Sequence, residues 1–170
     1  MPENAVFKSA VLLIEDDSKV LRLQFGTRSV KPGEKVPKGE AQRNPKLGWN
    51  VTSEQKFIII SLDVDAPFPS FAPLSPVLHW LQAGFTATSD GELTSSDPAI
   101  AYWAGPGPPP ISSPHRYIFL LYEQPADFDA KLFSKSSGFG IKDRMRWDVS
   151  KFEKQAKLGS AIAATYFLSN

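Results

Sequence analysis

The order of hydrophobic and polar positions along the chain predicts mostly β structure. Residues 20–25 alternate apolar and polar side chains after the first position, which is typical of a half-buried strand. Residues 57–60 form an unbroken, β-branched apolar run, which predicts a strand buried on both faces. The same reasoning predicts further extended segments at 77–83, 100–103, 116–122 and 160–168.

One segment has convincing helical periodicity. Residues 149–159 place apolar side chains on one face, with Asp148 suited to the N-cap and Gly159 to the C-terminal stop. Residues 128–132 predict a short helical turn. No internal repeat or linker interrupts the sequence. We therefore expect one mostly β domain over residues 1–170 with few helices.

Fifteen prolines lie at the ends of these segments and in one dense cluster, which is not the distribution of a disordered tract. Prolines at 67, 69, 73 and 76 exclude a helix after the apolar run and predict an ordered loop. A Gly-Pro-Gly-Pro-Pro-Pro cluster occupies 105–110. It could be a polyproline ligand for an SH3-like partner. The interpretation we favour is a rigid wall, with glycine allowing close approach to a ligand.

Composition narrows the classes of protein that fit this pattern. With 42% hydrophobic and 22% charged residues, the 170-residue chain predicts a globular domain. The formal net charge is +1, so nucleic acid is not an expected partner. The absence of cysteine excludes disulfides and thiolate chemistry. No apolar run is long enough for a transmembrane segment and no secretory signal is visible, so we expect a cytoplasmic protein.

The chain's two histidines lie beside predicted strands, and two carboxylates follow another. His79 and His115 accompany the segments 77–83 and 116–122. Asp63 and Asp65 come directly after the run at 57–60, and at a spacing of two they point to the same side if the chain stays extended. Together these side chains predict one polar pocket.

Four interpretations of that pocket follow from the residue types. Two histidines with one carboxylate could ligate a metal, although no local spacing supports it. The same residues could act as general acid and base. No activated nucleophile is evident, because the chain has no Gly-x-Ser-x-Gly, no cysteine and no P-loop. Tyr117, His79 and Gly107 could donate hydrogen bonds to an anion. Alternatively, an aspartate pairs with a histidine only to satisfy buried polar atoms. The last two interpretations stay equally open on residue types alone.

Four motifs in register carry a family resemblance. They are Asp63-Val64-Asp65-Ala66-Pro67, His79-Trp80, the run from Tyr102-Trp103 to Pro108-Pro109, and His115-Arg116-Tyr117 with the apolar residues that follow. In order and spacing the chain resembles the phosphatidylethanolamine-binding protein family, which includes Raf kinase inhibitor protein and carboxypeptidase Y inhibitor. The resemblance covers roughly residues 12–168, and the motifs at 114–117 and 123–125 are most similar to those of fungal members.

The resemblance implies a large antiparallel sheet with a smaller sheet, a few peripheral helices and a small anion pocket. It also implies a cis Ala66–Pro67 bond. The positions that match the family's signatures give the ligand-binding residues that we expect: Asp63, Asp65, Pro67, His79, Trp80, Gly107, Pro108, Pro109, His115 and Tyr117. Among them, Asp63 is expected on the ligand side and Asp65 is expected to hold the turn.

Two departures from the family pattern stand out. Val64 occupies a position where the first signature usually has proline, and Ile111-Ser112-Ser113 stands where many members have Gly-Thr-Gly. The second departure lies at the expected pocket rim and affects which headgroup would fit.

The expected function is non-catalytic binding of a phosphate, carboxylate or phospholipid headgroup, without cofactor or metal. A protease or a kinase is the expected protein partner. The alternative is an enzyme of a biosynthetic pathway that uses His79, Asp63 and His115 for acid–base or cyclisation chemistry on a small molecule. A third hypothesis is a scaffold whose pocket is vestigial.

Overall fold

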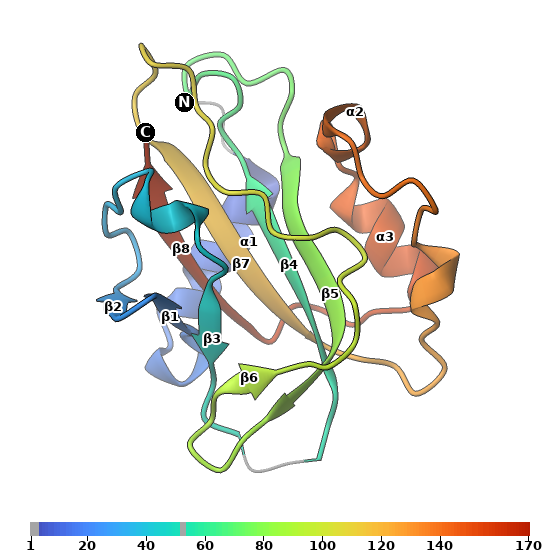
Figure 1. Cartoon of the computed structure of the whole chain (residues 1–170). Helices are drawn as coiled ribbons and strands as arrows, with labels where there is room; N and C mark the ends of the chain where they lie inside the picture. The colour runs from blue at the N-terminus through green and yellow to red at the C-terminus, as the bar shows by residue number, and fades with distance from the viewer. Residues whose placement is uncertain (1–3, 52–53) are drawn as a thin grey trace.

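A five-stranded antiparallel sheet forms the centre of the molecule (Figure 1). The computed structural model describes residues 4–51 and 54–170. The strand order is β6-β5-β4-β7-β8. The strands are β4 (Phe57–Asp63), β5 (Val77–Ala87), β6 (Leu93–Thr94), β7 (His115–Glu123) and β8 (Ala163–Ser169). A second, three-stranded antiparallel sheet has the order β2-β1-β3. Its strands are β1 (Arg22–Phe25), β2 (Arg28–Val30) and β3 (Lys46–Gly48). The predicted mostly β fold is confirmed.

The large sheet separates two hydrophobic cores. Along β4, Ile58, Ile60 and Leu62 face the core shared with helices, whereas Phe57 and Ile59 face the core shared with the small sheet. Because successive side chains of a strand point to opposite faces, this alternation fixes the register of the sheet. All seven residues of β4 are buried, as predicted for a central strand.

The helix α1 (Ala5–Ile14) covers one face of the large sheet and was not predicted. Its N-cap is Asn4, whose side chain accepts hydrogen bonds from the backbone N–H of Val6 at 3.0 Å and of Phe7 at 3.3 Å. Side chains of α1 pack at helical spacing on the core beneath it. The expectation of a few helices therefore holds, although periodicity identified only one of the longer ones.

The predicted C-terminal helix is confirmed as α3 (Val149–Gln155). The Asp148 side chain caps it, accepting from the Lys151 N–H at 2.9 Å. It ends earlier than predicted, because the left-handed conformation that follows it is adopted by Lys157 (φ 55°) and not by Gly159.

The remaining helical segments are short. They are η1 (Asp17–Lys19), η2 (Glu40–Gln42), η3 (Ala130–Leu132) and α2 (Ile141–Arg144). The turn η3 lies in the predicted 128–132 segment, whereas α2 was not predicted. Residues 100–103, predicted as a strand, contribute only an isolated bridge between Ala101 and Leu81.

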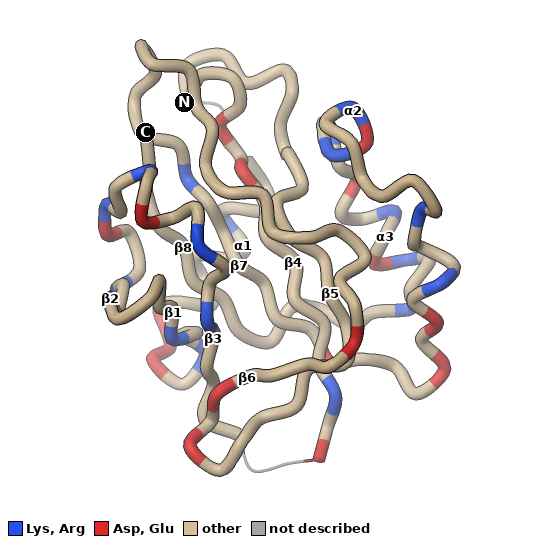
Figure 2. Tube along the Cα trace, in the orientation of Figure 1, with Lys and Arg blue, Asp and Glu red and all other residues tan. Residues whose placement is uncertain are grey.

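Backbone and surface features complete the fold. The Ala66–Pro67 bond is cis, as the family resemblance implied, and Ser75–Pro76 is also cis. Figure 2 shows basic and acidic residues interspersed over the small sheet and over the helical side of the described chain. Within the described ranges, none of the helices has the length and apolar character needed to span a bilayer.

Candidate functional site

Three central strands bring the predicted site residues to one end of the large sheet. The strand β4 ends at Asp63, which pairs with Val77 at the start of β5 and with Tyr117, two residues after β7 begins at His115. A cavity of about 300 Å³ lies there. The predicted residues that line it are Asp63, Pro67, His79, Gly107, Pro108, Pro109 and His115.

Asp63 and His115 form a buried pair in the cavity wall. The Asp63 Oδ2 atom lies 2.8 Å from His115 Nδ1, and Oδ1 accepts the backbone N–H of Asp65 at 2.8 Å. On the other side of the imidazole, Nε2 is 3.1 Å from the carbonyl oxygen of Pro67. The His115 side chain is 1% exposed and that of Asp63 is 6% exposed, so each of these two groups depends on the other for a hydrogen bond.

His79 is held as a neutral imidazole. Its Nδ1 atom makes a short hydrogen bond to the carbonyl oxygen of Ala104, which can only accept, so Nδ1 carries the proton. Burial lowers the pKa of His79 below its ordinary value of 6.5, against the opposing charge of Asp63. In this state Nε2 is an acceptor. His79 therefore donates to an anion only after it takes up a proton.

Tyr117 presents a buried hydroxyl that makes no hydrogen bond of regular geometry within the described residues, although Asp63 and the Gly107 N–H lie close to it, and Tyr117 is not among the residues that line the cavity. Its ring stacks on Phe167 at 5.1 Å and meets His79 edge-on at 5.1 Å. Burial, and secondly the nearby charge of Asp63, raises the pKa of Tyr117, whereas the Gly107 N–H opposes this shift. The hydroxyl thus stays protonated. An unpaired buried donor costs about 1–3 kcal/mol, which a ligand acceptor would recover.

Arg144, which was not predicted as a site residue, lines the same cavity from α2. Its guanidinium donates to the carbonyl oxygens of Leu78 at 3.2 Å and Tyr102 at 2.9 Å. It forms no ion pair within the described residues. Burial lowers the pKa of Arg144, although a guanidinium stays charged at neutral pH. The cavity therefore has a fixed positive charge beside its apolar wall.

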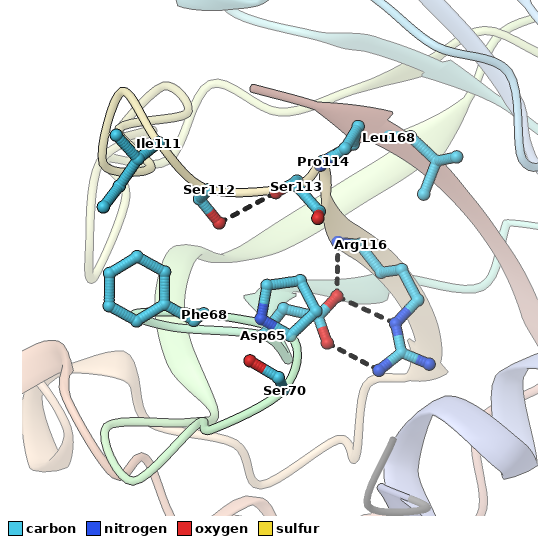
Figure 3. A pocket seen from close by; sticks show the side chains of 10 residues that line it. Asp65, Phe68, Ser70, Ile111, Ser112, Ser113, Pro114, Arg116 and Leu168 are labelled. Atoms are coloured by element: carbon cyan, nitrogen blue, oxygen red, sulfur yellow. Dashed lines mark hydrogen bonds and ion pairs between the residues drawn. The ribbon is translucent and has the colours of Figure 1, made fainter.

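The second carboxylate faces a different hollow. After Asp63 the chain bends instead of staying extended, and Asp65 accepts the Nε–H of Arg116 at 2.8 Å and its Nη2–H at 2.5 Å. The backbone N–H of Arg116 also donates to Asp65 at 2.8 Å. Figure 3 shows this fork in the wall of a hollow of about 600 Å³. The two aspartates thus have separate surroundings.

Trp80 also lies away from the cavity. Its ring is packed edge-on against Phe85 at 5.6 Å in the core between the two sheets. Its Nε1–H donates to Gln82 Oε1 at 3.1 Å. Trp80 therefore supports the strand β5 beside the site and does not line the cavity.

Comparison with known proteins identifies the family to which this chain belongs. Residues 26–167 match the sequence model described as phosphatidylethanolamine-binding protein. The chain belongs to the phosphatidylethanolamine-binding protein family. The resemblance found in the sequence motifs is therefore confirmed, while the similarity to fungal members in particular stays a prediction.

Two relatives and one solved structure are similar to this chain over most of its length. The putative odorant-binding protein A5 of Drosophila melanogaster is 29% identical over 161 residues, covering 93% of this chain and 73% of the relative. Phomoidride biosynthesis cluster protein N of Talaromyces stipitatus is 29% identical over 159 residues, covering 83% and 78%. A crystal structure of carboxypeptidase Y inhibitor complexed with the cognate proteinase has a TM-score of 0.76 and 25% identity, and covers 97% of this chain and 90% of that one.

Proposed function

We propose that the chain is a binding protein whose cavity takes a small anionic group, a phosphate or carboxylate such as a phospholipid headgroup. One observation carries the proposal: the buried hydroxyl of Tyr117 makes no hydrogen bond of regular geometry within the described residues, although it lies near Asp63 and Gly107. An anionic oxygen would supply an acceptor. Membership of the phosphatidylethanolamine-binding protein family supports the same ligand class.

Each side chain has a distinct role in this proposal. The hydroxyl of Tyr117 donates to the anion, and Arg144 contributes a positive charge. Asp63 is hydrogen-bonded to His115 and accepts from an ammonium group when the ligand has one. His79 gains a proton as the anion binds, because an anion beside Nε2 stabilises the imidazolium. Pro108 and Pro109 form part of the apolar wall.

Calorimetric titration with O-phosphoethanolamine and with inorganic phosphate tests the cavity. Tyr117→Phe should weaken binding roughly tenfold or more, since a hydrogen bond to a charged group contributes about 1.5–3 kcal/mol. The matched control is Tyr122→Phe. Tyr122 is also buried and lies on β7, but its hydroxyl donates to Glu153 at 2.8 Å, away from the cavity. Absence of saturable binding, or equal losses in the two variants, would reject the assignment.

A second candidate function is inhibition of a protease. The specific observation is the similarity over 97% of this chain to a carboxypeptidase Y inhibitor whose crystal structure contains its cognate proteinase. The assay is hydrolysis of a chromogenic peptide by carboxypeptidase Y at increasing concentrations of this protein. Concentration-dependent loss of activity is the expected result, and unchanged hydrolysis at micromolar inhibitor would exclude this enzyme as the partner. The predicted kinase partner and cytoplasmic location stay predictions.

A further inference from the structure

Three side chains that are distant in the sequence form a continuous hydrogen-bonded line. Ser112 Oγ lies 2.9 Å from His115 Nε2, and His115 Nδ1 lies 2.8 Å from Asp63 Oδ2. Each of the three residues is less than a tenth exposed. A hydroxyl, an imidazole and a carboxylate in this order and at these distances have the geometry of a nucleophile, its general base and the group that orients the base.

These three hydrogen-bonded residues connect the anion cavity with the larger hollow. Asp63 and His115 line the anion cavity, whereas Ser112 lines the larger hollow on the other side of the rim. Figure 3 shows the Ser112 hydroxyl on the rim segment, directed toward the side of the hollow where Phe68 and Asp65 lie. A molecule in the hollow could therefore meet the hydroxyl without entering the cavity.

We propose that Ser112 is an acyl-accepting nucleophile that reacts with carboxylic esters bound in this hollow. Phe68, Ile111 and Leu168 give the hollow apolar walls, so the acyl group that it accepts is apolar. Asp65 and Arg116 neutralise each other in the same wall, which leaves no net charge to recruit an ionic substrate. This activity goes beyond the proposed anion binding and does not depend on it.

The reaction balances with the ester and water alone. Ser112 Oγ bonds to the carbonyl carbon while its proton moves to His115 Nε2, and Asp63 stabilises the imidazolium. The backbone N–H of Ser113, which has no acceptor within the described residues, is the adjacent donor for the oxyanion. The ester C–O bond then breaks and the leaving alkoxide takes the proton from Nε2. Water hydrolyses the acyl-serine to a carboxylic acid.

Two further hydrogen bonds define what must move. The Ser112 hydroxyl can donate to the carbonyl oxygen of Ser113 at 2.8 Å, so its hydrogen turns toward Nε2 before attack. The Pro67 carbonyl oxygen, 3.1 Å from Nε2, can only accept, so it faces the lone pair of the base before attack and gains a hydrogen bond from the imidazolium that attack creates. Rotation of one hydroxyl hydrogen is a small rearrangement, and the Pro67 contact stabilises the charged form of His115.

A fluorophosphonate probe tests the proposal on the intact chain. The serine oxygen bonds to phosphorus and fluoride leaves with the serine proton. We expect a single adduct, located by peptide mass spectrometry at Ser112, that is lost in Ser112→Ala and retained in Ser70→Ala. Ser70 is the matched control because its side chain lines the same hollow and makes no hydrogen bond to His115 within the described structure. Absence of an adduct, or an adduct that persists in Ser112→Ala, would overturn the proposal.

A second pair of variants keeps the test independent of the folding of Ser112→Ala. The chain has no cysteine, so Ser112→Cys and Ser70→Cys each introduce a unique thiol. A thiol beside a base forms its thiolate more readily and is alkylated faster. We expect the rate of alkylation by iodoacetamide to reach half of its maximum at a lower pH at position 112 than at position 70, a comparison that does not depend on the smaller exposure of position 112. An equal or higher midpoint at position 112 would show that His115 does not activate this site and would equally overturn the proposal.

Discussion

Replacement of Asp65 by asparagine removes one charge from a nearly dry ion pair without changing the size of the side chain. Asp65 is 1% exposed and accepts three hydrogen bonds from Arg116. The guanidinium also lies 4.3 Å from the centre of the Phe7 ring, which holds it in place. In Asp65→Asn it stays there without a compensating carboxylate.

The cost follows from burial. Removal of one partner from a buried ion pair destabilises the folded protein by about 3–5 kcal/mol. The Arg116 side chain is 16% exposed, so water screens part of the unpaired charge and we expect the lower end, about 3 kcal/mol. For a chain of this length each kcal/mol lowers the melting temperature by about 2–4 °C, which predicts a decrease of roughly 6–12 °C.

Equilibrium urea unfolding measures the effect in Asp65→Asn, in Arg116→Met and in the double variant. We expect the double variant to be more stable than the sum of the two single losses, since it leaves no unpaired charge. Asp127→Asn is the control, because the Asp127–Lys157 ion pair is exposed and should contribute little. A loss below about 1 kcal/mol in Asp65→Asn, the range of exposed pairs, would refute the reasoning.

Three further predictions address the site and the backbone. Because burial lowers the pKa of His79, the unfolded chain binds a proton at this imidazole more readily than the folded chain does. The free energy of unfolding should therefore fall as the pH drops below about 6.5. His79→Gln should reduce this pH dependence in urea titrations from pH 7.5 to 5. Gly84→Ala should destabilise the protein by at least about 1–2 kcal/mol, because Gly84 has φ +75° and a Cβ there would lie 2.0 Å from an Asp97 oxygen. Gly159→Ala is the control, since a Cβ at that position meets nothing within 4 Å. Equal melting temperatures of the two variants would contradict this prediction. Asn4→Ala should cost about 1 kcal/mol by removing the cap of α1, and unchanged thermal unfolding would show that the cap contributes nothing.

The strands were predictable because their patterns are local. The run at 57–60 is apolar at every position, and a strand covered on both faces requires that composition. The helix α1 was missed because its longest apolar run, at 11–14, is too short to show a helical period by itself. With Val6 and Phe7 included, the apolar positions have helical spacing, and Asn4 is then visible as a cap.

The composition of the site was less predictable than its location. Motifs placed Asp63 and His115 together, and the structure shows them in one cavity wall. The partner of Asp65 could not be read from the sequence, because it depends on where β4 stops and the chain bends. Arg144 and Ser112 reach the site through a four-residue helix and a rim loop, and neither has a periodic pattern that links it to the strand ends.

The alternation of faces along β4 has a consequence for how this protein can change in evolution. β4 is paired on both edges, with β5 and with β7, so a change in its length disturbs both pairings. One residue inserted within β4 would move each later side chain of the strand to the opposite face of the sheet, so that Asp63 would point toward the helices. Insertions in the loops at 66–76 and 104–114 carry no such penalty. We therefore expect relatives to vary ligand preference by lengthening these loops while the length of β4 stays constant.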